Sequence, residues 1–236
     1  WKKNYIFNKD KNFFKWQFYN KATKRYNFII AKDANKIIGC IGFIPNSIYS
    51  SNFKNKDHIW LVNWIVSKDY NSASLKLMHY LLKEINFSFI GTIGCTNKTY
   101  KILKAFGFKT GKLTHIVNEN KNIKNFKIGD FKNLKNLKKN KLPLNYKIKL
   151  VDKKLLSIFF KKIIPINFKD KEYFLNRYVN HPLYKYKLYG VWKSDQPHGF
   201  LVVRACKFSK SKSLKIVDYH GHKIDIESLF VSFNKI

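Results

Sequence analysis

Acidic residues and arginine are scarce in this sequence of 236 residues. Asp and Glu together number 14 against 47 Lys and Arg, so the formal net charge is +33. Such a charge favours a polyanionic partner, either nucleic acid or an anionic membrane surface. Only Arg25, Arg177 and Arg204 are arginine, however, and arginine is the side chain best suited to bidentate contacts with phosphate and guanine. Because the lysines are spread along the whole chain, we attribute the charge to coding composition and keep nucleic acid as the weaker alternative.

Cysteine is also rare, and its odd number argues against a disulfide framework. Cys40, Cys95 and Cys206 are widely spaced, and each is predicted to lie in an apolar strand-like run, where free cysteine behaves as a small hydrophobic residue. A reducing compartment, and with it a cytoplasmic location, is therefore expected. His220 and His222 have no matching ligands nearby in the sequence, so no metal site is expected.

Long apolar runs are absent as well, which argues against a membrane span. A helix that crosses a bilayer needs about 20 consecutive apolar residues, and the run 155–160 ends at Lys161 and Lys162. No signal peptide is recognisable in the sequence. The sequence opens on Trp1 and contains a single methionine, Met78, so we expect the natural start to lie outside it.

Apolar residues are nevertheless abundant enough for a folded protein. Hydrophobic residues make up 45% of the chain and aromatic residues 17%, far from the composition of disordered chains. At roughly 100–200 residues per domain the length allows one or two domains, and we expect two, over 1–118 and 146–236. Eight lysines fall between Lys121 and Lys141. The segment 119–145 is therefore predicted to be a solvated connector, with a polyanion-binding arm or a capping helix as alternatives.

Strand and helix patterns follow one another in the first half. The apolar runs 28–31 and 37–44, separated by the turn 33–35, predict a hairpin. The run 59–66 is too continuous for a half-exposed strand and is predicted to be a central one. After a polar loop over 67–74, apolar residues recur at helical spacing. They are Leu75, Leu77, Met78, Leu81, Leu82 and Ile85.

The remaining elements of this half complete a sheet. We predict a strand over 87–94, a helix over 99–106 that stops at Gly107, and a closing strand over 115–117. The order is then hairpin, strand, helix, strand, helix, strand. This order predicts an α/β fold of the α+β kind, with a mixed, mostly antiparallel sheet flanked by helices.

The second half repeats part of this order. A hairpin and a strand follow two helices, and a further helix comes last. The segments are helices over 155–163, 173–179 and 226–233, strands over 186–192, 200–204 and 214–218, and a turn over 194–196. The final strand, helix and strand of the first half have no counterpart, so we expect this half to be truncated.

Three segments resemble the GNAT superfamily of acyl-CoA-dependent N-acyltransferases. They are 36–39 in the hairpin, 63–78 across the central strand and its helix, and 103–108 at the end of the next helix, and the similarity spans 28–117. The resemblance implies a GNAT-like sheet that binds the pantetheine arm of acetyl-CoA or another acyl-CoA, followed by a second, incomplete GNAT-like half. The pyrophosphate would lie at the start of the helix. The cofactor-binding residues so implied are Ile65, Val66, Ser72, Ala73, Ser74, Leu75 and Asn97.

The sequence departs from the GNAT pattern at two places. Ser72 and Ser74 stand where the superfamily has loop glycines, although serine hydroxyls can bond phosphate and cap a helix. Leu103 stands where many members carry a tyrosine that protonates the leaving thiolate, so this acid is missing. The cations for a CoA phosphate would come from lysines near the helix starts. They are Lys68, Lys76 and Lys98.

An amine acceptor must lose a proton, which requires a carboxylate, histidine or ordered water in reach. Our candidates for catalytic residues are Asp57, Asn63, His181 and Asp218. The last two are better placed in principle, because an acceptor cleft would form where the two halves meet. His79 is expected on the polar side of its helix.

The run 177–186 further resembles the second halves of paired GNAT proteins encoded with surface-polysaccharide biosynthesis. This resemblance implies transfer of an acyl group from acyl-CoA to the amine of a nucleotide-linked amino sugar. One alternative is a non-catalytic, degenerate GNAT-fold module that recruits a partner or polyanion. Another is an aminoacyl or peptidyl transferase that acts with an RNA partner.

Overall fold

The computed structural model describes residues 6–113, 116–117, 146–163, 169–209 and 211–224. The chain divides into two compact units, Trp1–Lys112 (unit 1) and Leu113–Ile236 (unit 2). The predicted connector over 119–145, the predicted helix over 226–233 and His115 lie outside the described residues. Within the described ranges no helix is long and apolar enough to cross a membrane.

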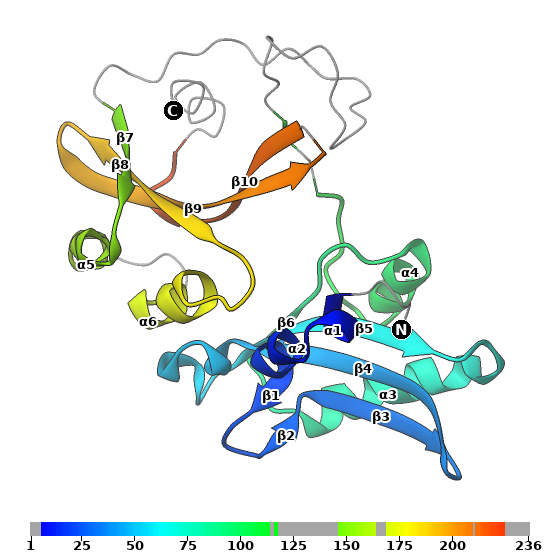
Figure 1. Ribbon diagram of the computed structural model, residues 1–236. Coiled ribbons are helices and arrows are strands. Elements are labelled where there is room, and N and C mark those ends of the chain that lie inside the picture. Colours follow the sequence, from blue (N-terminus) through cyan, green and yellow to red (C-terminus); the bar gives the residue numbers. More distant parts are fainter. Residues whose placement is uncertain (1–5, 114–115, 118–145, 164–168, 210, 225–236) are drawn as a thin grey trace. The chain divides into compact units, whose positions relative to one another are not determined.

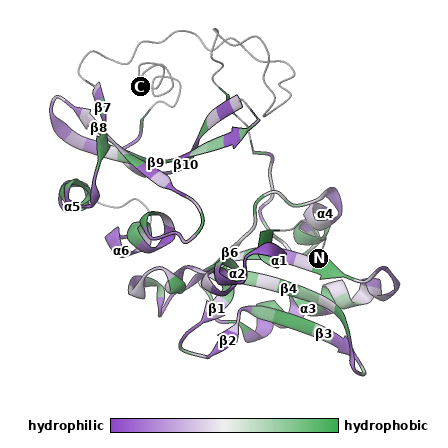
Figure 2. Ribbon diagram, viewed as in Figure 1, coloured by the Kyte–Doolittle hydropathy of each residue, from purple (hydrophilic) through white to green (hydrophobic). Residues whose placement is uncertain are grey.

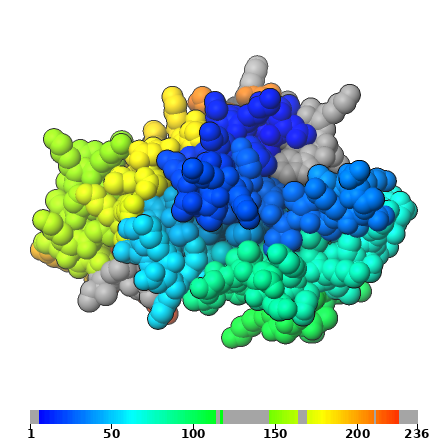
Figure 3. All heavy atoms as spheres, turned by 90° about the horizontal axis from the view of Figure 1, so that it is seen from below, coloured from blue at the N-terminus to red at the C-terminus, as the bar shows by residue number. Residues whose placement is uncertain are grey.

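Unit 1 opens with two helices that the sequence patterns did not predict. These are α1 (Ile6–Lys9) and α2 (Lys11–Phe18), followed by the short hairpin of β1 (Tyr19–Asn20) and β2 (Arg25–Tyr26). The Asp10 carboxylate caps α2 by accepting a hydrogen bond from Phe13 N at 2.8 Å. Phe18 packs on Phe28 of the sheet with ring centroids 4.7 Å apart. In Figure 3 the residues of α2, in dark blue, lie beside the segment 46–57 in light blue.

The sheet of unit 1 has the strand order β3-β4-β5-β6. Its strands are β3 (Phe28–Asp33), β4 (Lys36–Pro45), β5 (His58–Val66) and β6 (Phe89–Gly91). The first three are antiparallel and β6 is parallel to β5. The predicted hairpin and the mixed sheet flanked by helices are thus confirmed, and Figure 2 shows hydrophobic residues gathered along β3 and β4.

Two expected strands of this half differ in the structure. The strand predicted over 87–94 contracts to three residues, and Ile116 and Val117 are not in a strand. The short β6 is explained by its sequence, because it ends at Gly91 and the exposed Ile93 and Gly94 follow without a strand-like alternation. Cys95 was expected in this strand, but it is exposed and lies in the segment just before the next helix.

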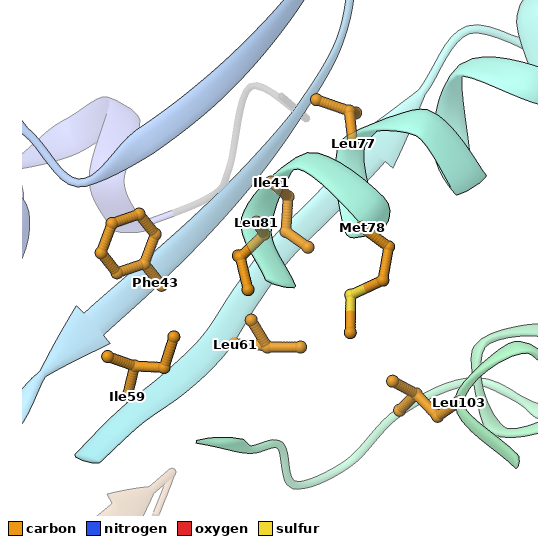
Figure 4. Close-up of a cluster of buried hydrophobic side chains, with 8 residues drawn as sticks. All are labelled: Ile41, Phe43, Ile59, Leu61, Leu77, Met78, Leu81 and Leu103. Carbon is orange, nitrogen blue, oxygen red and sulfur yellow. The ribbon is translucent and has the colours of Figure 1, made fainter. Parts of the chain in front are cut away.

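Helices α3 (Asn71–Glu84) and α4 (Asn97–Ala105) pack on the sheet face opposite α2. Along β4, Ile41 and Phe43 point to α3, whereas Gly42 faces the Phe28 ring on the α2 side, as the alternation of a strand requires. Figure 4 shows the resulting core between the sheet and the two helices. Its buried side chains are Ile41, Phe43, Ile59, Leu61, Leu77, Met78, Leu81 and Leu103.

Both ends of α4 follow local sequence signals. Thr96 caps the helix by accepting a hydrogen bond from Thr99 N at 3.2 Å, so the helix begins two residues before the predicted start. At its other end Gly107 has φ +81°, and Phe108 N donates to Leu103 O at 3.0 Å. This is the glycine-terminated helix end that the sequence predicted.

Unit 2 is a four-stranded antiparallel sheet with helices on one face (Figure 1). Its strand order is β10-β9-β8-β7. The elements are β7 (Tyr146–Val151), α5 (Lys153–Lys162), α6 (Lys171–Phe174), a π-helical turn η4 (Leu175–Val179), β8 (Tyr186–Lys193), β9 (Gln196–Phe208) and β10 (Ser211–Gly221). The predicted hairpin, the strand after it and both preceding helices are confirmed. The aspartates Asp152 and Asp170 cap α5 and α6.

The two faces of this sheet carry different side chains. One face carries a hydrophobic cluster of Tyr189, Val191, Leu201 and Val203. On the other face Phe159 and Phe160 of α5 and Phe174 of α6 pack around Phe200, with ring centroids 4.9 to 5.9 Å apart. The face covered by the helices also carries the polar residues described next.

Candidate functional site

A β-bulge decides which residues of β5 point to the core. Two residues of β5, Asn63 and Trp64, stand opposite the single residue Ile41 of β4, and Asn63 has φ +52°. Ile59 and Leu61 before the bulge and Trp64 and Val66 after it all pack on the α3 side.

The run 59–66 forms a central strand, as predicted, but it is not buried throughout as its continuity suggested. The continuous apolar run consists of two alternating patterns that are out of phase, joined by the bulge. Ile65 falls on the opposite side from the core and is 48% exposed.

β5 keeps β6 as a neighbour over only part of its length. The parallel pairing joins His58, Ile59 and Trp60 to the three residues of β6. Thr92 Oγ1 then donates to Leu61 O at 3.1 Å, and within the described residues 62–66 pair with β4 alone. No strand among the described residues pairs with the far edge of this stretch, which is the arrangement that lets an extended ligand pair with a strand's main chain.

The start of α3 lies immediately after this strand. Ser67 N donates to Ile38 O at 2.8 Å, a 3-10 turn η3 (Lys68–Tyr70) follows, and α3 begins at Asn71. Ser72 and Ser74 thus lie within the first helical turn, so the loop predicted over 67–74 ends earlier, at Tyr70, and neither serine caps the helix. The N-cap residue is Tyr70, which makes no side-chain capping bond. The amides of a first helical turn have no partner within the helix itself.

The remaining predicted cofactor residues lie on either side of this turn. Ala73 is buried, whereas Leu75 is 50% exposed. The prediction that Leu75 belongs to the apolar stripe of α3 is therefore wrong. Asn97 is exposed at the start of α4. Its neighbour Lys98 reaches across to Asn71, with Nζ 3.2 Å from Oδ1. This hydrogen bond joins the beginnings of α3 and α4 and places the ammonium group of Lys98 beside the start of α3.

Asp57 lies just before β5 and Asn63 within it, and no contact joins their side chains among those that the structure describes. Asp57 precedes β5 and accepts a hydrogen bond from Ser47 N at 3.1 Å, and burial raises the pKa of its carboxyl while hydrogen bonds from Ser47, His58 and Asn46 oppose that rise. This geometry lets Asp57 close the loop from Asn46 to Asp57. The Asn63 carbonyl accepts a weak hydrogen bond from Cys40 Sγ at 3.8 Å.

In unit 2 a second bulge places Asp218 on the face covered by the helices. Ile216 pairs with Val203 and Asp218 with Val202, so Val217 is the additional residue of β10. The Asp218 carboxylate receives Lys169 Nζ at 2.7 and 3.0 Å and the Tyr178 hydroxyl at 2.8 Å. Its own neighbour Tyr219 N donates to Oδ1 at 2.9 Å. Both oxygens of this carboxylate are already engaged, so the group is a fixed acceptor rather than a free base.

His181 is engaged in the turn between η4 and β8. Its Nδ1 accepts hydrogen bonds from Leu183 N at 3.1 Å and Tyr184 N at 3.0 Å. An Nδ1 that accepts carries no proton, so the neutral ring holds its proton on Nε2. Burial, together with Arg177 and Arg204, lowers the pKa of His181 to about 4. At neutral pH the ring is uncharged and has no lone pair left to act as a base.

His181 and Asp218 belong to one cluster, because ring contacts of Tyr186 and Tyr178 connect them. Tyr178, which donates to Asp218, lies 5.2 Å from Tyr186, and the His181 ring lies 5.4 Å from the same Tyr186 (centroid distances). Sequence reasoning missed three partners in this cluster: Lys169, Tyr178 and Arg204. A signal was available, because two of the three arginines of the chain fall in this unit.

Neither protein-family models nor curated proteins gave a match to this chain. Among the residues that the structure describes, no group of three or more His, Cys, Asp or Glu side chains is arranged to hold a metal ion. The chemistry of the protein is therefore inferred from the geometry of β5 and α3 in unit 1 and of the Asp218–His181 cluster in unit 2.

Proposed function

We propose that the protein is an N-acyltransferase that moves an acyl group from acyl-CoA to the amine of a nucleotide-linked amino sugar, in surface-polysaccharide synthesis. The observation that carries this proposal is the separation of β5 from β6 beside an uncapped helix start. β5 pairs with β6 only as far as Trp60, and α3 begins without a side-chain cap at Asn71.

Each part of an acyl-CoA has a counterpart in this arrangement. The pantetheine arm contains amide groups, which would pair with the main chain of residues 62–66 along the edge where no described strand lies. The pyrophosphate would lie at the first-turn amides of α3, where the helix dipole favours negative charge. Lys98, held against Asn71, would supply a cation there.

The transfer itself conserves protons. The amine nitrogen attacks the thioester carbonyl carbon, and the carbon–sulfur bond breaks. The nitrogen loses one proton and the CoA thiolate gains one. Leu103 is buried in the hydrophobic core, at 3% exposed, so no acid at this position protonates the thiolate. With His181 neutral and Asp218 fully bonded, the proton would move through solvent.

Titration calorimetry with acetyl-CoA tests the binding half of the proposal, and a Ser72→Asp variant locates the site. Ser72 is exposed in the first turn of α3, where an added carboxylate stabilises the helix by about 0.3–1 kcal/mol but repels a pyrophosphate. We expect acetyl-CoA to bind the natural chain and the variant to bind at least about tenfold more weakly, a loss of roughly 1.4 kcal/mol. Thermal unfolding should show the variant to be at least as stable as the natural chain.

Asn12→Asp is the matched control. It adds the same charge to the first turn of α2, on the opposite face of the sheet, at another exposed position. Equal weakening by both variants, or no heat from folded natural chain at millimolar acetyl-CoA, contradicts the proposed site. Binding without release of free thiol in the presence of amino-sugar nucleotides would instead support the non-catalytic module, and release that requires RNA would support the RNA-dependent transferase.

A further inference from the structure

Arg204 in unit 2 contacts neutral side chains. Its guanidinium carbon stands 4.2 Å from the centre of the Tyr184 ring, and its N–H groups donate to the side chains of Tyr186 and Cys206. Within the described residues no carboxylate forms an ion pair with it. A half-buried cation without a carboxylate is unfavourable unless something else supplies negative charge.

A second arginine approaches the same place. Arg177 and Arg204 both act electrostatically on His181 and on Tyr186, where they oppose the rise in the pKa of Tyr186 that burial causes. The carboxylate that the aromatic rings connect to this cluster, Asp218, is neutralised by Lys169 at 2.7 Å. Since His181 is uncharged at neutral pH, it adds no positive charge to those of the two guanidiniums.

The geometry also orients one of these cations. Arg204 and Tyr186 are paired across β9 and β8 in the sheet register, so their side chains project from the same face. Stacking on Tyr184 fixes the plane of the guanidinium. A guanidinium has more N–H donors than Tyr186 and Cys206 can occupy, so donors remain for a ligand.

We propose that Arg204 and Arg177 form a binding site for the phosphate group of a small phosphorylated molecule. A phosphate carries about −1.5 to −2 charges at pH 7 and its oxygens match the arginine fork, so it would supply negative charge beside Arg204. The diphosphate of the nucleotide-linked acceptor in the proposed function belongs to this chemical class. Only that identification rests on the proposed function, because the phosphate site itself lies within unit 2.

Arginine modification tests this site without any variant, because the chain has three arginines. Phenylglyoxal would be applied to the full chain, and the labelling rate of each arginine would be followed by peptide mass spectrometry. We expect saturating UDP or inorganic pyrophosphate to slow labelling of Arg177 and Arg204 several-fold. Arg25, exposed in unit 1, is the internal control and should be labelled at an unchanged rate. Sodium chloride at matched ionic strength should protect none of the three.

A calorimetric titration with UDP gives an independent readout. Arg204→Gln should weaken UDP binding about tenfold or more, the usual effect of losing a charge-assisted hydrogen bond, whereas Arg25→Gln should leave it unchanged. Circular dichroism would show whether the Arg204 variant is folded, and the labelling experiment decides the question if it is not. Equal protection of all three arginines, or of none, overturns the site.

The same labelling experiment with coenzyme A in place of UDP shows whether the phosphate comes from a nucleotide-linked acceptor or from the acyl donor. Protection by UDP but not by CoA identifies the ligand as a nucleotide-linked acceptor, and protection by CoA alone overturns that identification. Failure of the phosphate site leaves acetyl-CoA binding at Ser72 untouched, so the two proposals fail separately.

Discussion

His220 in unit 2 is a buried polar residue, at 2% exposed. Neither ring nitrogen has a hydrogen-bond partner among the described residues, and the ring packs against Phe160, Phe174 and Phe200 at centroid distances of 4.7, 5.6 and 5.2 Å. A charged imidazole is unfavourable in such surroundings, and burial lowers the pKa of His220 from 6.5 to about 4. The neutral ring behaves here as part of the aromatic core.

This shift predicts a pH dependence of stability. Between pH 6.5 and about 4 the unfolded chain binds a proton at His220 that the folded chain does not, so stability is lost as the pH falls through this window. The full shift corresponds to at most about 3 kcal/mol. His220→Leu should remove this part of the slope in urea unfolding measured from pH 7 to pH 4, and should stabilise the protein at the acid end.

The comparison needs a histidine that is not buried. His79→Leu changes an exposed histidine on α3 and should leave the slope as it is in the natural chain. Part of the slope should persist in His220→Leu as well, because the pKa of His181 is also lowered to about 4. An unchanged slope in the His220 variant would contradict the assignment.

At the scale of elements, two β-bulges decide which side chains of β5 and β10 face the helices, and capping residues decide where the helices begin. The bulge at Asn63 turns Trp64 and Val66 to the core of unit 1, and the bulge at Val217 turns Asp218 and His220 to the helices of unit 2. The helix ends are set locally, by Asp10, Thr96, Asp152 and Asp170 at the starts. Strand registers depend on partners distant in the sequence, whereas helix caps do not.

The end of α4 offers a direct test of such a local signal. Gly107 has φ +81°, where an added Cβ is strained even though no atom lies within 4 Å of it. Gly107→Ala should lower the free energy of unfolding by about 1 kcal/mol in urea. Gly111→Ala, at a glycine without positive φ and with equally open space, should leave stability unchanged or raise it by up to about 1 kcal/mol. Equal losses in both variants would show that the left-handed conformation is not the cause.

At the scale of the whole molecule, the charge of +33 is the largest electrostatic feature. It is carried almost entirely by lysine and belongs to both units, while two of the three arginines are confined to one aromatic cluster. A diffuse lysine surface attracts any polyanion, but it provides little recognition of a sequence or a shape. We therefore attribute non-specific attraction of polyanions to the lysine surface, and binding of specific phosphate groups to the two proposed sites.

Salt dependence distinguishes these contributions. Duplex DNA should bind at low salt, and its affinity should fall about 10³-fold or more between about 50 and 200 mM salt, as expected for many released counterions. Fluorescence anisotropy with two unrelated DNA sequences would measure it. Acetyl-CoA binding over the same range should change far less, because one small ligand neutralises few charges. Selective DNA binding that persists at physiological salt would favour the nucleic-acid alternative over acyl transfer.

Local sequence signals were sufficient for most elements. The turn around Ala34, the stop at Gly107 and the helical spacing of Leu77, Met78 and Leu81 predicted the hairpin, the end of α4 and the buried face of α3, because each depends on residues close together in the chain. The patterns also selected His181 and Asp218 as candidates.

Tertiary structure decided the rest. No spacing in the sequence shows that Asn63 and Val217 are inserted into bulges, that Ser72 is already helical, or that Lys169 occupies the carboxylate of Asp218. These facts depend on strand register and on contacts between residues far apart in the chain, which are settled only when the two faces of each sheet are packed.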